Sequence, residues 1–138
     1  MIDILIPVLG RPHNAGPLVQ NIRDTTTVEH RIVFLCSRGD HPQYEACREA
    51  MRQSPPKSVS VIDTDRPAGR GDYAQKINQG FRMSHGEWLF MGADDLRFEP
   101  RWDTAALKAA GTRHSVVTPF GIALIAVCGS MTRERKPP

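Results

Sequence analysis

The sequence predicts an α/β domain of three layers, α/β/α, in which helices cover both faces of a mostly parallel sheet. Short apolar runs rich in β-branched residues alternate along the chain with amphipathic segments of helical length, as in βαβ units. The chain has 138 residues, 40% of them hydrophobic and 24% charged, which suits one globular domain. We expect a single domain over residues 1–130 and a disordered tail over residues 131–138.

Charge and cysteine content narrow the classes of function. The net charge of +3 and the pI of about 9.0 mildly favour anionic ligands, but no dense basic stripe favours nucleic acid. Three cysteines without metal-ligand spacing, and no secretory leader, predict a reducing, cytoplasmic location. The late apolar run "FGIALIAVCG" is far shorter than the roughly 20 residues that span a bilayer, so no membrane span is expected.

Apolar, strand-length runs are the first class of predicted element. They lie at residues 2–8, 31–37, 58–64, 87–91, 114–120 and 122–128. The first is a short β-branched run that suits a buried parallel strand, and the fourth is nearly continuously apolar.

The segments between these runs predict helices. Two are expected to begin near a proline, Pro17 or Pro42. The third is expected to be capped by Asp72, paired with Gln75, and to end at Gly86. A short fourth helix is expected to be capped by Asp103.

The turns after the first four strands predict where a ligand binds. In open parallel sheets, ligands bind beyond the carboxyl ends of the strands. The turns that follow those ends read "VLGRP", "SRGD", "DTDRP" and "GADDL". The candidate site therefore lies along this edge.

Adjacent aspartates, Asp94 and Asp95, follow the apolar fourth strand. Two unpaired carboxylates at the end of a buried strand repel each other and are costly to remove from water. One interpretation is that the pair faces water and one member caps the next turn. The other is that a hard divalent cation, Mn²⁺ or Mg²⁺, neutralises the pair and bridges it to a phosphate. In both, the pair is exposed and contributes little to folding stability.

Three segments carry a resemblance to a known family. "IDILIPVLGRP", "GDYAQKINQGF" and "GEWLFMGADDL" resemble, in order and spacing, segments of the inverting family 2 glycosyltransferases, over about residues 2–107. The resemblance implies a nucleotide-diphospho-sugar transferase (type A) fold, a UDP- or GDP-sugar donor, Mn²⁺ or Mg²⁺, and an acceptor of unknown identity.

The resemblance also implies roles for individual residues. The residues implied to bind the nucleotide-sugar are Pro7, Val8, Arg11, Ser37, Asp63, Gly71, Tyr73, Lys76, Ala93 and Asp94. Within this set Lys76 is expected to direct a point charge toward phosphate, while Asp94 and Asp95 are expected to ligate the metal. For Arg11 and Lys76 the alternative interpretation is a solvated surface charge.

The chain departs from the family pattern at three places. Gly92 stands where the family's acidic motif often begins, and Cys36 and Ser37 stand where acids usually read the base. Family members usually continue well past this length, so the acceptor half looks shortened and the catalytic residues are unknown. A partner chain or a homodimer is expected to cover the exposed side of the sheet.

Two other functions remain open from the sequence. A non-catalytic or degenerate nucleotide-sugar-binding module is consistent with the missing base and with Gly92. A nucleotidyltransferase would share the layered sheet, but "LGRPHNAG" lacks the lysine expected after the first strand.

Overall fold

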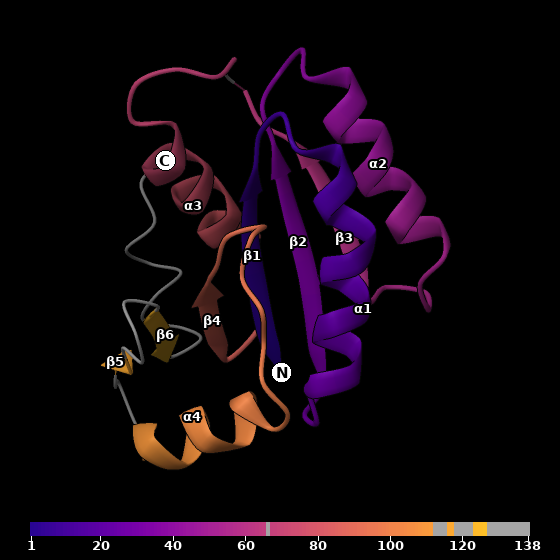
Figure 1. Ribbon diagram of the computed structural model, residues 1–138. Helices are drawn as coiled ribbons and strands as arrows, with labels where there is room; N and C mark the ends of the chain where they lie inside the picture. The colour runs from indigo at the N-terminus through magenta and orange to yellow at the C-terminus, as the bar shows by residue number, and fades with distance from the viewer. Residues whose placement is uncertain (66, 112–115, 118–122, 127–138) are drawn as a thin grey trace.

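The structure is a computed structural model that describes residues 1–65, 67–111, 116–117 and 123–126 (Figure 1). The predicted tail, residues 131–138, lies outside the described residues. None of the helices in the described part of the chain is long and apolar enough to cross a membrane.

Strands and helices alternate through most of the chain. In order they are β1 (Ile2–Val8), the 3₁₀ helix η1 (Pro12–Asn14), α1 (Ala15–Thr25), β2 (His30–Cys36), α2 (His41–Arg52), β3 (Val59–Asp63), α3 (Asp72–Met83), β4 (Trp88–Met91), α4 (Trp102–Ala110), β5 (Val116–Val117) and β6 (Ala123–Ala126).

The described strands form one sheet in the order β3-β2-β1-β4-β6-β5. β1 pairs in parallel with β2 and with β4, and β2 pairs in parallel with β3. β6 runs antiparallel to both β4 and β5. The predicted α/β class with a mostly parallel sheet is confirmed.

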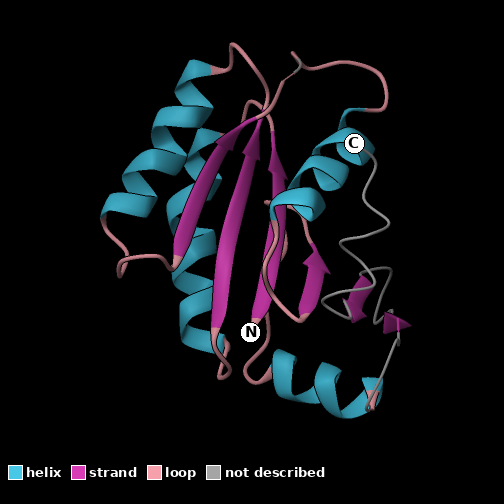
Figure 2. Cartoon of the chain, turned by 180° about the vertical axis from the view of Figure 1, so that it is seen from behind, coloured by secondary structure: helices cyan, strands magenta, loops and turns pink. Residues whose placement is uncertain are grey.

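Helices cover both faces of this sheet. α1 and α2 lie on one face, and the connection from β4 to α4 runs back along that same face (Figure 1). Seen from behind, α3 crosses the opposite face (Figure 2). Each face has its own hydrophobic cluster, with Phe34 and Ile22 in the larger one and Leu35 and Ile77 in the smaller one. The sheet is therefore the middle of three layers, as predicted.

β1 lies at the centre of the core because its side chains pack into the hydrophobic clusters on both faces of the sheet. Ile4 and Ile6 pack on the α1 side, whereas Leu5 packs under α3, and all three are fully buried. α3 approaches closely at Gly80, where an added Cβ would lie 3.0 Å from Leu35 Cδ1. A larger residue at this position would push the helix away from the sheet.

A buried carboxylate anchors the amino edge of β1. Asp3 accepts hydrogen bonds from Arg31 Nε at 3.0 Å and from the backbone N–H groups of His85 and Gly86 at 2.7 and 2.8 Å. Gly86 was expected to end the third helix, but α3 ends at Met83. Gly86 lies instead against β1, where a Cβ would come within 2.9 Å of the Asp3 backbone nitrogen.

Neither predicted aspartate cap is an N-cap of its helix. Gly71, in a left-handed conformation, is the N-cap of α3, and Asp72 is the first helical residue. Asp103 lies inside α4 and accepts hydrogen bonds from the backbone N–H groups of Thr27 and Val28 at 2.8 and 2.7 Å. It therefore ties α4 to the turn between α1 and β2.

The pKa of Asp103 is lowered by these contacts. Burial by itself would raise the pKa, but the hydrogen bonds that the carboxylate accepts, led by the Val28 and Thr27 N–H groups, outweigh it. A lowered folded-state pKa stabilises the fold above the pKa of the unfolded chain. That contribution is lost as the pH falls through the folded-state value.

We predict that Asp103→Asn lowers the free energy of unfolding by about 2 kcal/mol at pH 7, because hydrogen bonds to a buried charge are lost. Urea denaturation measures the loss, and the gap between wild type and variant should narrow in acid. Glu99→Gln, at an exposed acid shortly before α4, is the matched control and should unfold like wild type. Equal effects of the two substitutions would contradict the assigned role.

Candidate functional site

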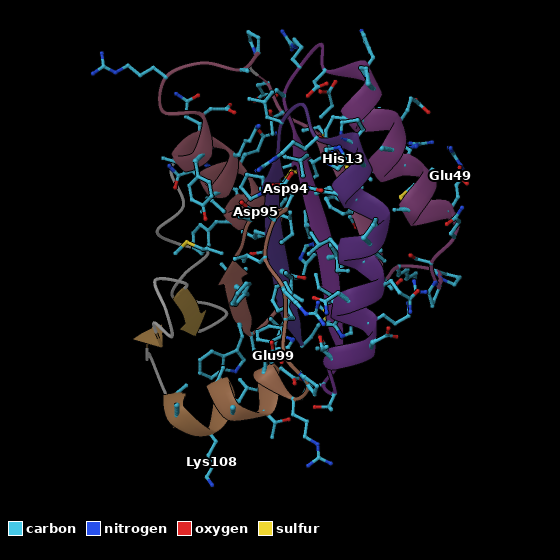
Figure 3. The ribbon with its side chains drawn as sticks, in the orientation of Figure 1. His13, Glu49, Asp94, Asp95, Glu99 and Lys108 are labelled. Atoms are coloured by element: carbon cyan, nitrogen blue, oxygen red, sulfur yellow. The ribbon has the colours of Figure 1, made fainter. Side chains whose placement is uncertain are left out.

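The direction of the strand order reverses between β1 and β4, whose carboxyl ends lie next to each other. From β1 the chain moves outward to β2 and then to β3, and it returns to the other side of β1 with β4. This reversal is a topological switch point, where open α/β sheets bind ligands. Figure 3 shows Asp94 and Asp95 side by side where the chain leaves β4, with Glu99 farther along the same connection. The aspartates thus lie at the edge that the sequence predicted.

An ion-paired cluster joins the two strand ends. Arg11, after β1, donates from Nε to Asp94 Oδ2 at 3.1 Å and from Nη2 to Asp94 Oδ1. Its Nη1 lies 3.6 Å from Asp95 Oδ2. The Asp94 side chain is only 1% exposed, whereas those of Arg11 and Asp95 are 48% and 59% exposed. The two aspartates therefore differ: one is a buried, bidentate partner of arginine, and the other faces solvent.

The loop that carries Arg11 is held by the start of α2. Asp40 Oδ2 accepts from Gly10 N at 2.8 Å, and Gln43 Oε1 accepts from Arg11 N at 2.7 Å. Gln43 is fully buried, so its amide is fixed by packing. Gln43 therefore holds the backbone of Arg11, and Asp94 holds its guanidinium.

Core packing favours glycine at position 92, where the family's acidic motif often begins. A Cβ at Gly92 would lie 2.7 Å from Ile6 Cδ1 and 3.2 Å from Phe90 Cε1. A carboxylate there would have to displace core side chains of β1 and β4. The position therefore cannot supply a third acid without repacking.

Lys76 forms a second, buried cluster at the end of β1. Its Nζ donates to Val8 O at 2.8 Å and pairs with Asp72 Oδ2 at 2.7 Å. Ser37 Oγ donates to the same Asp72 oxygen at 3.4 Å. Lys76 is 2% exposed, so the interpretation of a solvated surface charge is wrong. In this structure its charge is directed at Asp72 and the β1 terminus.

Cys36 is the other residue that stands where the family usually has a base-reading acid, and its thiol is packed in the core. It is fully buried at the end of β2, and contact with Cys47 together with burial raises the pKa of its thiol. A protonated, inaccessible thiol is not a nucleophile.

Tyr73 links α3 to the exit of β4. Its hydroxyl donates to Gly92 O at 3.2 Å, while the residue as a whole remains 51% exposed. Burial of the hydroxyl region raises the pKa of Tyr73, which keeps it a donor. The ring therefore offers a half-exposed aromatic surface near Ala93, which is partly buried.

Two hollows adjoin these clusters. One, of about 210 Å³, lies between the loop after β3 and α3 and is lined by Thr64, Asp65, Asp72, Gln75, Lys76, Asn78, Gln79 and Arg82. The other, of about 560 Å³, lies between α1 and the connection after β4 and is lined by Asn14, Pro17, Leu18, Gln20, Asn21, Asp24, Asp94, Asp95, Leu96 and Arg97. Asp94 and Asp95 thus border the larger hollow, and Lys76 borders the smaller.

The structure does not bring all the predicted residues into one cluster. Arg11, Asp94 and Asp95 meet. Val8 contributes its backbone oxygen but buries its side chain in the core, and Pro7 is half-buried within β1. Asp63 lies exposed at the end of β3, and Gly71 begins α3.

Sequence analysis missed Asp40 and Gln43, which hold the loop after β1 at this edge. Their only signal was position, since each falls at the start of a helix that follows a strand end.

The fit of a divalent cation follows from these contacts. Both oxygens of Asp94 accept hydrogen bonds from Arg11, which leaves Asp95 as the more available ligand. No group of three or more potential ligand side chains gathers anywhere in the described part of the chain. A divalent cation at this edge would therefore need ligands besides these described side chains, such as waters or phosphate oxygens.

We predict that Asp94→Asn lowers the free energy of unfolding by about 2 kcal/mol, since it weakens a buried charge-assisted pair. Asp95→Asn should change it by no more than about 0.5 kcal/mol, as expected for an exposed carboxylate. The expectation that both aspartates are exposed is wrong for Asp94. Thermal or urea unfolding of the two variants measures the difference, and comparable losses would refute it.

Comparisons with known proteins support the fold. No protein-family model matches the chain, and no curated protein matches it in sequence. Among solved structures it is similar to "Mannosyltransferase PcManGT from Pyrobaculum calidifontis in complex with GDP-Man and Mn2+", with a TM-score of 0.70 and 16% identity over 82% of this chain. The chain spans 33% of the length of that protein. The chain thus has an α/β/α fold like that of a glycosyltransferase, as the sequence predicted.

Proposed function

We propose that this chain is the donor-binding part of a glycosyltransferase, similar to the inverting family 2 enzymes. It binds a nucleotide-diphospho-sugar, a UDP- or GDP-sugar, between the ends of β1 and β4. The observation that carries the proposal is the convergence of Arg11, Asp94 and Asp95 at the switch point of the sheet. The fold shared with a mannosyltransferase in complex with GDP-Man and Mn2+ supports a nucleotide-sugar donor.

The reaction would transfer the sugar to an acceptor hydroxyl. The acceptor oxygen forms a bond to the anomeric carbon, the bond from that carbon to the diphosphate breaks, and the hydroxyl proton passes to a base. The nucleoside diphosphate leaves with the bonding electron pair. In an inverting reaction, attack comes from the face opposite the diphosphate. The acceptor and the base remain unassigned.

The residues of the site would have different roles in binding the donor. Arg11 presents guanidinium N–H groups at the edge where the diphosphate would lie, and Asp94 keeps them oriented. Asp95 would hold Mn²⁺ or Mg²⁺ together with the donor. When bound, the cation would act as a Lewis acid that stabilises negative charge on the departing diphosphate. The half-exposed ring of Tyr73 offers a surface near the nucleoside.

A non-catalytic nucleotide-sugar-binding module is the second candidate. It is favoured by the lack of room for an acid at Gly92 and by the engagement of Asp94 with Arg11. Both leave fewer free carboxylates than a three-acid metal motif would provide. A cytoplasmic location and assembly as a homodimer belong to this proposal in either case.

The experiment that tests the function uses the whole chain with Mn²⁺ and a panel of UDP- and GDP-sugars that includes GDP-mannose. Calorimetry measures binding, and release of nucleoside diphosphate measures turnover. Binding with release supports the enzyme, and binding without release across the panel supports the module. Absence of binding to every donor would overturn both.

We predict that Asp95→Asn weakens Mn²⁺-dependent binding of GDP or UDP by about tenfold or more, roughly 1.4 kcal/mol. The physical reason is loss of the carboxylate best placed to share the cation with the diphosphate. Asp24→Asn is the matched control, because Asp24 is an exposed acid lining the same hollow. Calorimetry should show control affinity within twofold of wild type. An unchanged affinity for Asp95→Asn would remove Asp95 from the site.

A further inference from the structure

We infer that Arg11 is an internal cation that competes with the divalent metal, so that this chain binds the metal strongly only together with a diphosphate. The inference rests on the proposed function and concerns the order and coupling of ligand binding at that site. It also gives Arg11 a role distinct from that of a residue lining a base pocket.

The first step of the argument is the position of the guanidinium. Its three nitrogens face the two adjacent carboxylates: Nε and Nη2 donate to Asp94, and Nη1 lies 3.6 Å from Asp95. This is the place where a divalent ion would have to lie to neutralise both acids. One positive charge already opposes two negative charges there. A free Mn²⁺ ion therefore meets a site whose net charge is reduced from two negative charges to one, and repulsion by the guanidinium weakens its binding at short range.

The second step is that Arg11 cannot readily leave. Its backbone N–H is bound by the buried Gln43, and the preceding residue, Gly10, is bound by Asp40. Asp94 is buried and bound through both oxygens, so removing the guanidinium would leave an uncompensated buried charge. The weak part of the cluster is the longer, exposed contact between Arg11 and Asp95.

The third step is what a diphosphate changes. Its negative charge lets Arg11 and a divalent cation lie in the same site, because the phosphate oxygens can accept from free guanidinium N–H groups and ligate the metal together with Asp95. Nucleotide and metal then bind cooperatively. By linkage, each raises the affinity of the other by the same factor.

The test measures Mn²⁺ binding alone, by calorimetry or by the electron paramagnetic resonance signal of free Mn²⁺, and then in the presence of saturating GDP or UDP. The variant is Arg11→Met, which keeps a long side chain and removes the charge. Without nucleotide, the variant should bind Mn²⁺ at least tenfold more tightly than wild type. Nucleotide should also raise the Mn²⁺ affinity of Arg11→Met less than it raises that of wild type, by a similar factor of at least ten.

A matched control separates this competition from general electrostatics. Arg97→Met removes an exposed arginine that lines the hollow beside Asp95, and it should change Mn²⁺ affinity by less than twofold. If Arg11→Met unfolds, the double variant Arg11→Met with Asp94→Asn replaces it, because no buried charge then lacks a partner. The double variant should also bind Mn²⁺ more tightly than Asp94→Asn alone.

Failure of this inference is distinct from failure of the proposed function. If Arg11→Met, or the double variant in its place, binds free Mn²⁺ no more tightly than its reference, or if Arg97→Met has the same effect, the competition is refuted. Wild type could still bind nucleoside diphosphate with Mn²⁺ in that case. If wild type binds no nucleoside diphosphate under any condition, the proposed function fails instead.

Discussion

The pair of Arg11 with buried Asp94 is the interaction on which the site depends. It joins the loop after β1 to the exit of β4, the two strand ends between which the topology reverses. Removing a carboxylate from water is costly, and two charge-assisted hydrogen bonds from one guanidinium offset that cost. Because β1 and β4 are far apart in sequence, this pair ties together two strand ends that only the sheet brings side by side.

A second buried pair supports the same edge from the opposite face of the sheet. Lys76 on α3 binds the last carbonyl of β1 and is neutralised by Asp72 one turn earlier. Together the two pairs hold the end of β1 from both sides. Asp95 is left as a solvent-exposed carboxylate beside these two pairs.

The comparison of Asp94 with Asp95 shows how far pattern reasoning extends. The two are neighbours in sequence and the pattern predicts one role for both, yet Asp94 is buried against Arg11 and Asp95 faces water. Gly86 and Asp103 show the same limit: each was assigned to its own helix and instead contacts a distant segment. At both positions local preference predicted a helix boundary, whereas Gly86 donates to the Asp3 side chain and Asp103 accepts from the backbone of Val28.

The sequence by itself determined the α/β class, the first four strands, and the edge where the candidate residues gather. These follow from the spacing of apolar residues, which depends only on local backbone geometry and on burial. Only the tertiary structure decided that β4 returns beside β1, that Arg11 faces Asp94, and that a side chain at Gly92 would displace Ile6 in the core. The physical reason is that these are contacts between strand ends far apart in sequence, and no local pattern encodes which strands become neighbours.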